Sequence, residues 1–305
     1  MSGLIPRWRQ LHAQPLLDRV PAIVVKSLCQ GSADSSLARR RVTLAYLWRH
    51  RRLPDLGSAP RFTELVQRRK LYDRDPRQIV LMDKLAAKQL AADALGSDWI
   101  TPTLWEAQIL PPAARLQVPS IIKARHGCNQ FAVLQSKPAP AAWAALRRRS
   151  ARWMAGPYGT WLDEWAYASV ARALIAEPLV GDASVLPLDY KVYVFGGQAT
   201  HVQVHLDRGF DHRWVLHDRT FRPLVAGSDR PAPPRSLNAM LEAAEILAQG
   251  FDFLRVDFYD IDGAARFGEF CLYPGSGLDP FAEDWIDFEL GGLWHDAAAT
   301  RQYLH

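Results

Sequence analysis

The stretch LRVDFYDIDGAARFGEFCLY, residues 254–273, combines acidic and basic residues at the spacing of a β-strand. Side chains of a strand point alternately to its two faces, so Arg255 and Asp257 share one face while the apolar residues between them take the other. Glu269 follows after a turn. A cation beside an acid, facing a second acid across a hairpin, is typical of a surface salt-bridge ladder or of a metal site.

The turn between the two strands decides whether the acids meet. A two-residue loop at 262–263 would put Asp257 and Glu269 on opposite faces. A three-residue loop at 261–263, with its glycine in the left-handed region, shifts the pairing by one residue. We therefore predict the three-residue loop, with Arg255 opposite Glu269 and Asp257 on its diagonal at roughly 7 to 8 Å. That separation suits two carboxylates sharing Mg²⁺, which completes its shell with phosphate and water oxygens.

The composition is that of a globular chain: 305 residues, 49% of them hydrophobic and 23% charged, enough for two or three subdomains. No apolar run is long enough to span a bilayer, and the start MSGLIPRWRQ lacks a signal-peptide pattern, so we expect a cytoplasmic protein. The three cysteines, Cys29, Cys128 and Cys271, are far apart and indicate neither a disulfide framework nor a CxxC zinc site.

The net charge of +5 is unevenly distributed, because many basic residues occur in clusters. They lie at 39–41, 49–52, 68–70 and 147–149. They are consistent with a face that binds nucleic acid or the inner surface of an anionic membrane, or with a solvated helical surface, which we favour. No RNA-binding aromatic signature accompanies them, so we expect no nucleic-acid partner.

The first half of the chain predicts a helical start followed by a small sheet. Residues 1–78 are mostly helical in pattern, with an apolar run at 22–29 and an interruption at 53–60. A helix follows, capped by Asp83 and ended by Gly96. Three predicted strands follow. PSIIKAR and FAVLQS are joined by the turn HGCNQ, and LIAEPLV is a buried strand. The tryptophan-rich segment 150–172 is predicted to be helical in its second half.

The second half of the chain predicts a hairpin, a helix and the hairpin of residues 254–273. DYKVYVFGGQATHVQVHLD alternates on both sides of the turn at 196–197. SLNAMLEAAEILAQG has helical periodicity, with Ser236 as N-cap and Gly250 at its end.

In chain order, the motifs are MDKLAAK, PSIIKARHG, IAEPLV, DYKVYVFGG, RVDFYDIDG and FGEF. This series resembles the ATP-grasp superfamily, which includes D-alanine:D-alanine ligase and glutathione synthetase. It is most similar to the teichuronopeptide-biosynthesis-like (TupA-like) branch, with its K-x-x-H-G, DYK and RVDFY…GE…YP…G patterns, over roughly residues 60–290. The resemblance implies an α+β ATP-grasp fold, in which two α+β subdomains with antiparallel sheets clasp ATP. We place a mostly helical N-terminal region at 1–78, a first subdomain at 79–180 and a second at 181–305.

The resemblance also implies nucleotide-binding residues. Lys84 and Lys123 would reach the ATP phosphates as point charges, although Lys84 also suits the solvated face of its helix. The loop that starts with His126 and Gly127 would cover the phosphates with backbone N–H groups, with fewer glycines than in many relatives. Glu177 matches the hinge that binds the adenine and ribose side.

Further roles concern the reacting groups. Asp189 and Lys191 share a strand face and would approach the nucleotide or the acceptor, or form a cross-strand salt bridge. By resemblance, Asp257 and Glu269 are metal ligands, and Arg255 stabilises the negative charge of an acyl phosphate or tetrahedral intermediate.

The acceptor side is less regular. Relatives commonly carry Asn at the position of Cys271, and a thiol suits Mg²⁺ poorly. Gly275 and Gly277 match a turn whose backbone approaches the acceptor. Arg208, beside Asp207, is a candidate for binding an acceptor carboxylate.

Other patterns are given structural interpretations. His201 and His205 share a strand face but lack a third ligand nearby in the sequence, so surface or partner contacts are favoured over zinc. Asp260 and Asp262 form a D-x-D pattern that a hairpin turn explains. No G-x-S-x-G, Walker or H-E-x-x-H pattern is present.

The resemblance implies an ATP- and Mg²⁺-dependent carboxylate–amine ligase that forms an amide through an acyl phosphate. The acceptor is expected to be a cell-surface polysaccharide or its uronic-acid precursor, with an amino acid as amine. The basic clusters would assist peripheral membrane association. A small-molecule or sugar kinase and a degenerate ATP-binding module are the alternatives, with a glycosyltransferase less favoured.

Overall fold

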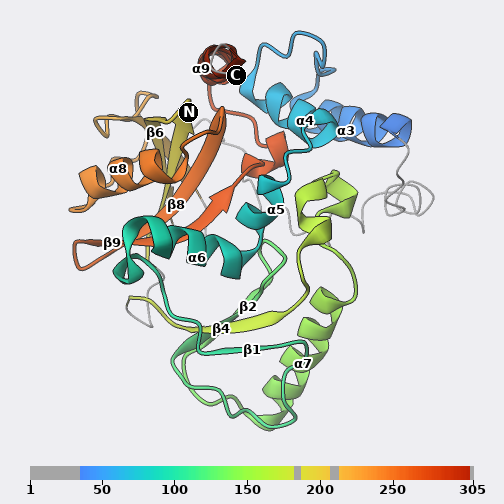
Figure 1. Cartoon of the computed structure of the whole chain (residues 1–305), viewed down its shortest axis with the longest axis vertical. Coiled ribbons are helices and arrows are strands. Elements are labelled where there is room, and N and C mark those ends of the chain that lie inside the picture. Colours follow the sequence, from blue (N-terminus) through green and yellow to red (C-terminus); the bar gives the residue numbers. More distant parts are fainter. Residues whose placement is uncertain (1–34, 182–186, 207–212, 303–305) are drawn as a thin grey trace, which may run out of the picture.

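Two antiparallel sheets form the framework of the computed structural model, which describes residues 35–181, 187–206 and 213–302 (Figure 1). The small sheet has the order β1 (Trp105–Ala107), β4 (Leu174–Pro178), β2 (Ser120–Ala124), β3 (Phe131–Leu134). The large sheet has the order β7 (Arg213–Asp218), β6 (Gln198–Leu206), β5 (Asp189–Phe195), β8 (Phe253–Ile261), β9 (Ala264–Cys271). Cys29, the apolar run at 22–29 and Arg208 lie outside the described residues.

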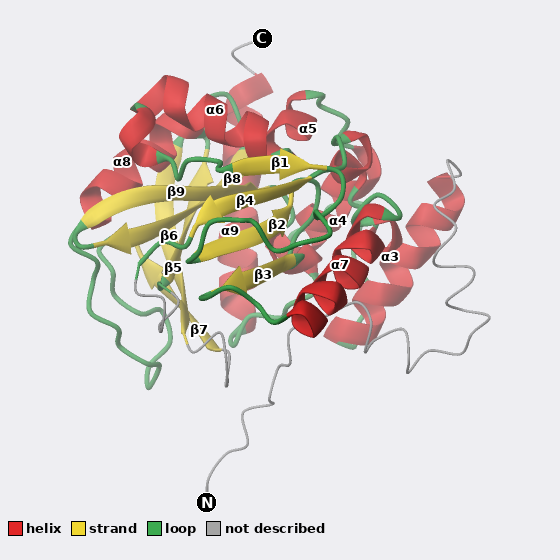
Figure 2. Ribbon diagram, turned by 90° about the horizontal axis from the view of Figure 1, so that it is seen from below, coloured by secondary structure: helices red, strands yellow, loops and turns green. Residues whose placement is uncertain are grey.

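Helices pack on both sheets. The α-helices are α3 (Ser35–His50), α4 (Phe62–Tyr72), α5 (Arg77–Met82), α6 (Lys84–Leu95), α7 (Pro140–Met154), α8 (Leu237–Leu247) and α9 (Asp284–Gln302). Short 3₁₀ helices are η1 (Ser97–Trp99), η2 (Thr160–Leu162), η3 (Trp165–Ser169) and η4 (Pro274–Gly277). In Figure 2, α6 and α8 lie together along the large sheet. Helix α7 packs against β2 of the small sheet and lies far from α3 and α4 in Figure 1. Each sheet has its own apolar core.

The elements predicted from periodicity and caps are largely confirmed. Asp83 caps α6 by accepting from the backbone N–H groups of Leu85 and Ala86, and Gly96 ends the helix at φ 100°. The hairpins β2–β3 and β5–β6 and the buried strand β4 form where alternation predicted them. Asp260 accepts from the backbone N–H of Gly263, so it serves the β8–β9 turn as predicted.

Two local predictions are wrong. In the segment 150–172, the α-helix is at the beginning, where α7 ends at Met154, and the second half contains only short 3₁₀ helices. Ser236 precedes α8 but does not cap it, because its backbone N–H and its hydroxyl both donate to Asp260 Oδ2, at 3.0 and 2.8 Å. At its other end, α8 stops at Leu247, and the predicted Gly250 follows three residues later at φ 75°.

The predicted register of β8 and β9 is also wrong, although the two acids do meet. Ile261 pairs with Ala264, so the turn has two residues. A β-bulge between residues 257 and 258 of β8 leaves Gly268 of β9 as an extra residue, which shifts the pairing by one. Asp257 consequently pairs with Glu269, and Arg255 pairs with Cys271 rather than with Glu269.

Gly268 suits the bulge because a side chain would crowd the partner strand. A Cβ atom at this position would lie 3.0 Å from the carbonyl oxygen of Asp257. The glycine therefore permits the close backbone approach that brings the two acids opposite one another.

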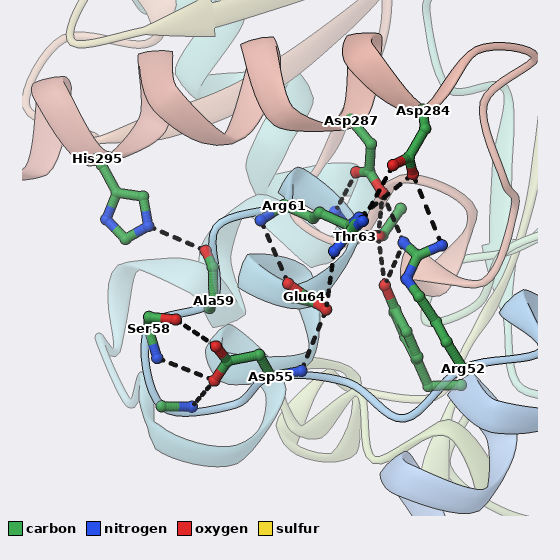
Figure 3. Close-up of polar contacts among 12 residues, drawn as sticks. Arg52, Asp55, Ser58, Ala59, Arg61, Thr63, Glu64, Asp284, Asp287 and His295 are labelled. Atoms are coloured by element: carbon green, nitrogen blue, oxygen red, sulfur yellow. Dashed lines mark hydrogen bonds and ion pairs between the residues drawn. The ribbon is translucent and has the colours of Figure 1, made fainter.

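Polar contacts join helix α4 and the segment before it to the C-terminal helix α9 (Figure 3). The Thr63 backbone N–H and hydroxyl donate to Asp287 of α9, at 2.8 and 2.7 Å. The guanidinium of Arg61 donates to Asp284 at 3.0 Å, and His295 contacts the carbonyl oxygen of Ala59 at 2.9 Å. Helix α4 is thereby held against α9.

The basic clusters are less solvated than the favoured interpretation supposed. Arg41, Arg69 and Lys70 are 6%, 4% and 2% exposed. Arg41 pairs with Asp163, and Arg69 donates to Asp252 at 2.5 Å. The interpretation as a solvated surface is therefore wrong for these three residues. Separately, none of the described helices is long and apolar enough to cross a membrane.

Substitutions at two adjacent glycines of α9 can test how this helix packs against residues 60–62. A Cβ atom on Gly291 would lie 2.3 Å from the Pro60 carbonyl oxygen, whereas one on Gly292 would meet nothing within 4 Å. We expect Gly291→Ala to lower the free energy of unfolding by about 1–3 kcal/mol through overpacking. Gly292→Ala, the matched control, should raise it by about 0.5–1 kcal/mol, because alanine favours a helix. Urea unfolding measures both; equal effects of the two substitutions would contradict this packing.

Candidate active site

A cavity of about 1510 Å³ is lined by residues of both sheets and of α6. Glu177 of β4 and Glu269 of β9 lie on its wall. Most of the side chains and glycines predicted to act together line this one cavity: Lys84, Lys123, Gly127, Glu177, Asp189, Lys191, Arg255, Glu269 and Gly275. Asp257 lies directly beneath this wall, 2% exposed, and contacts Lys191 and Arg255.

On the small sheet, one carboxylate holds two ammonium groups. Glu177 accepts from Lys123 at 2.7 Å through one oxygen and from Lys88 at 2.9 Å through the other. Burial raises the pKa of Glu177, but the two lysines outweigh it, so that the net pKa is lowered and the carboxylate is ionised at neutral pH. Two cations are thus placed side by side at the cavity wall.

Lys88 is a site residue that the sequence interpretation missed. It lies four residues after Lys84 on α6, so both project from the same helical face. That spacing, together with the predicted role of Lys84, could have identified Lys88 as a site residue from the sequence. Lys88 also donates to Thr103 Oγ1 at 2.8 Å, which fixes its direction.

Lys84 connects the two sheets across the cavity. Its ammonium group donates to the Gly127 carbonyl oxygen, in the loop after β2, at 2.7 Å. The same nitrogen lies 3.6 Å from Glu269 Oε2 on β9. This bridge does not fit the alternative that Lys84 belongs to the solvated face of its helix.

On the large sheet, Lys191, Asp257 and Glu269 form a row across the paired strands β5, β8 and β9. Lys191 Nζ lies 2.6 Å from Asp189 Oδ2 and 2.5 Å from Asp257 Oδ2. The cross-strand salt bridge that was one interpretation of this pair is therefore present between Lys191 and Asp257, while Asp189 contacts Lys191 within β5.

Arg255 forms a two-point contact with Asp257, at 2.7 Å from Nε and 2.8 Å from Nη2. Burial lowers the pKa of Arg255, but the charge of Asp257 outweighs this effect and raises that pKa well above its ordinary value. The guanidinium is therefore permanently charged at the cavity wall. Such a paired arrangement is how a buried acid remains compatible with the fold.

Glu269 fits a hard divalent cation if phosphate and water supply further oxygens. Asp257 would have to exchange a contact with Arg255 or Lys191 for the metal ion, because these cations engage both of its oxygens. Asp257 and Glu269 are directly paired across β8 and β9. The side chain of Glu269 is 37% exposed, so a metal ion in the cavity can reach it. Burial raises the pKa of Glu269, but Lys84 and Lys191 outweigh it and lower the net pKa, so Glu269 is ionised. Within 35–181, 187–206 and 213–302, no group of three or more His, Cys, Asp and Glu residues forms a metal site.

Cys271 does not add a ligand to this pair. Burial raises the pKa of its thiol to about 12, so it remains protonated at neutral pH. A protonated soft ligand does not compete with carboxylates for Mg²⁺.

Some predicted residues lie elsewhere. His126 is 0% exposed, its Nε2 contacts the Trp153 carbonyl oxygen at 3.0 Å, and it does not line the cavity. A Cβ atom on Gly277 would lie 2.3 Å from Gln67 Nε2, so this glycine allows α4 to approach closely. His201 is 5% exposed and burial lowers its pKa to about 4, so the predicted surface role is wrong. His205 lines the cavity.

The family model for the TupA-like ATP-grasp proteins matches residues 64–295. The chain belongs to this family. The match agrees with the roughly 60–290 over which the motifs resemble it, and it confirms the predicted family and ATP-grasp fold.

Similar solved structures include other ATP-grasp proteins. One is the ATP-grasp ligase PsnB complexed with a minimal precursor: 15% identity, 73% of this chain, 62% of that chain and a TM-score of 0.41. Another is D-alanine--D-alanine ligase from Bacillus anthracis: 14% identity, 74% of this chain, 70% of that chain and a TM-score of 0.45. The chain thus spans less than two thirds of the length of that PsnB chain. No curated protein matches the sequence.

The two lysines around Glu177 make stability depend on pH. Because the folded pKa of Glu177 is below its ordinary value of 4.5, its stabilisation is fully present above about pH 4.5 and is lost as the pH falls through the folded pKa. We expect Glu177→Gln to lower the free energy of unfolding at pH 7 by about 1–3 kcal/mol.

Urea unfolding of both proteins from pH 7 to pH 3 measures this difference, which should shrink toward acid pH. The exposed Glu242 of α8 supplies the control, since Glu242→Gln should change stability by less than about 0.5 kcal/mol. A difference for Glu177→Gln that stays constant with pH would contradict the proposed ion pairs.

Proposed function

We propose that this protein is an ATP- and Mg²⁺-dependent carboxylate–amine ligase. One observation carries the proposal: the lysine cluster of α6 and β2 lines the same cavity as Glu269, and Asp257, the strand partner of Glu269, lies directly beneath that wall. Membership of the TupA-like ATP-grasp family supports this class of enzyme. Cations on one side and carboxylates on the other suit a nucleotide triphosphate with its metal ion.

In this proposal, Lys84, Lys88 and Lys123 bind the phosphates. Each is an ammonium group on or near the cavity wall, and an ammonium acts as a point charge on phosphate oxygens. Glu177 acts through two of these lysines, which it holds in place, and the loop from Gly127 covers the phosphates.

Asp257 and Glu269 would hold Mg²⁺, which neutralises phosphate charge when bound. Lys191 and Arg255 contact the buried Asp257 and hold its carboxylate in place. Asp189 holds Lys191 from the other side, at 2.6 Å. The protein thus supplies position and charge, which is most of what phosphoryl transfer requires.

The reaction has two steps. A substrate carboxylate oxygen attacks the γ-phosphorus of ATP, and ADP leaves with the electrons of the broken P–O bond. The amine nitrogen then attacks the acyl carbon, the C–O bond to phosphate breaks, and amide and phosphate are formed. The charged guanidinium of Arg255 lies on the cavity wall, where it would stabilise the oxyanion of the second step.

The proposed acceptor is a uronic acid of a cell-surface polysaccharide or of its precursor, and the amine is an amino acid. The volume of about 1510 Å³ exceeds the roughly 300–1,000 Å³ of ordinary small-ligand pockets, which leaves room for more than a nucleotide. Its acceptor side includes Arg213 and Trp214, a cation and an aromatic ring suited to an acidic sugar. Arg39 and Arg40, exposed on α3, are the residues that we propose for peripheral contact with an anionic membrane.

An ADP-release assay with ATP and Mg²⁺, across a panel of uronic acids and amino acids, tests the proposal. Mass spectrometry of the products should find an amide, with phosphate released into solution. Phosphate retained on a sugar hydroxyl, without any amine requirement, would identify a kinase instead. ATP binding without ADP release on any pair would favour a binding module.

Glu269 offers a sharp test of the metal assignment, because it is accessible and its removal leaves the buried Arg255–Asp257 pair intact. Loss of a metal ligand worth several kcal/mol should reduce kcat by roughly 100-fold or more in Glu269→Gln. The control is Glu106→Gln on β1, which removes a carboxylate paired with Arg125 outside the cavity wall. Its rate should stay within about twofold of the unmodified protein. Full activity of Glu269→Gln would remove Glu269 from the metal site.

A further inference from the structure

A buried lysine of α4 contacts the turn η4 at the acceptor end of the cavity. Lys70 is 2% exposed, and its ammonium group lies 2.6 Å from both the carbonyl oxygen and the hydroxyl of Ser276. Its third contact is Gln67 Oε1 at 3.1 Å. The three N–H donors of this ammonium therefore each have a partner, so the group is held in one place. Burial lowers the pKa of Lys70 to about 8, which leaves it mostly protonated at neutral pH.

Ser276 is held in an unusual conformation. Its φ of 59° lies in the left-handed region, which costs energy for a residue with a side chain. Besides the contact with Lys70, its carbonyl oxygen accepts from Gln67 Nε2 at 2.9 Å. Helix α4 thus fixes the direction of the Ser276 hydroxyl, which lies on the cavity wall next to Gly275.

Glu164 approaches the same point from another loop. It is 5% exposed and lies on the cavity wall. The loop before it is tightly wound, with Gly159 at φ 75° and Asp163 at φ 58°, and the Glu164 backbone N–H donates to Gly159 at 3.1 Å. Arg41 of α3 anchors the loop through Asp163, with 3.0 Å between Nε and Oδ2. The position of Glu164 is therefore set by the fold.

The surroundings of Glu164 favour a carboxylate that can accept a proton. Burial raises its pKa; the charge of Lys70 and a hydrogen bond from Ser276 oppose this effect, and the net pKa remains above its ordinary value. Lys70 is the charged group that acts on it. The other titratable groups that face it have a pKa raised by burial and are neutral at neutral pH: Cys128, Tyr158, Tyr167 and Tyr273.

Glu164 also lies near the proposed reacting groups. A Cβ atom on Gly159 would lie 2.9 Å from the Cβ atom of Glu164, and a Cβ atom on Gly127 would lie 3.2 Å from the ring of Tyr158, the residue before Gly159. The Gly127 carbonyl oxygen accepts from Lys84, so this loop places Glu164 near the proposed phosphate site. Ser276, the hydrogen-bond partner of Glu164, is adjacent to Gly275 in η4. The carboxylate is thus on the cavity wall beside the acceptor turn, and no role in nucleotide or metal binding accounts for it.

We propose that Glu164 is the amine-binding group and general base of the ligase, and that Lys70 and Ser276 are its positioning residues. The inference rests on the proposed ligase function and assigns the site of its second substrate. A buried carboxylate at the acceptor end is suited to a primary amine, which arrives at neutral pH as an ammonium ion.

The proton balance of the amide-forming step is complete with this residue. Glu164 takes one proton from the ammonium group, which frees the nitrogen lone pair. The nitrogen forms its bond to the acyl carbon, and the C–O bond breaks as phosphate leaves. The second N–H proton goes to the departing phosphate, and Glu164 returns its own proton to solvent.

Hydroxylamine separates this role from a structural one. It is largely unprotonated at neutral pH and attacks an acyl phosphate without help from a base, yielding a hydroxamate. With a uronic acid active in the ADP-release assay, Glu164→Gln should lower amide formation by roughly 100-fold or more, the usual contribution of a general base. Hydroxamate formation, measured by colour with ferric iron, should stay within about twofold. The Glu106→Gln variant serves again as control.

Each outcome is decisive. Loss of amide with retention of hydroxamate supports the assignment. Equal loss of both products, or retention of both, overturns it. If the unmodified protein forms no hydroxamate and releases no ADP with any uronic acid, the proposed ligase function itself fails, which distinguishes that failure from a failure of the Glu164 assignment.

Ser276→Ala provides a second variant should Glu164→Gln fold poorly. Loss of the hydroxyl removes a hydrogen bond that lowers the pKa of Glu164, so this pKa should rise. A base acts in its ionised form, and the acidic limb of the pH profile for amide formation should therefore move to higher pH. The hydroxamate profile should not move. A shift of both profiles together, or of neither, would overturn the positioning role of Ser276 and Lys70.

Discussion

One extra residue in β9 determines the chemistry available to the large sheet. With a two-residue turn and regular pairing, Glu269 would face away from Asp257, because successive side chains of a strand alternate. The bulge at Gly268 restores the pairing of the two acids. The row from Lys191 through Asp257 to Glu269 depends on this irregularity. β-Bulges often re-aim side chains in this way next to active sites.

The buried charges around this row are tolerable because each has a partner. Asp257 is almost fully buried, yet Arg255 and Lys191 together engage both of its oxygens. On the small sheet, Glu177 relates in the same way to Lys88 and Lys123. Removing one member of such a set leaves an unpaired buried charge, which costs far more than the complete set contributes. Both sheets therefore present preorganised charge to the cavity between them.

The structure gives the N-terminal helices a larger role than their sequence suggested. Helix α4 is held to α9 and also sends Lys70 to the turn η4, while α3 anchors the loop of Glu164 through Arg41. The basic clusters 39–41 and 68–70 thus include buried ion pairs and hydrogen bonds that shape the cavity beside η4. The family match begins at residue 64, inside α4.

Local patterns predicted much of the site, and its non-local features could not be predicted. Asp83 and Gly96 marked α6, and alternation identified the strands that carry Lys123, Glu177, Lys191 and Asp257. The bulge at Gly268 depends on packing between strands, so turn chemistry alone suggested the wrong loop. Glu164 lies in a loop without periodicity. In the sequence, Lys70 is one of several basic residues in a charged helix, and nothing distinguishes it from the others. Only the tertiary structure brings these two residues together.

The central claim is that Asp257 and Glu269 share one divalent ion next to the phosphates of a bound nucleotide. A crystal structure with Mn²⁺ and a non-hydrolysable ATP analogue, analysed for anomalous scattering, tests it most directly. The account predicts an Mn²⁺ peak within bonding distance of oxygens from both carboxylates and from phosphate. A peak bound by other residues, or a nucleotide bound with neither carboxylate in contact with metal, would contradict it.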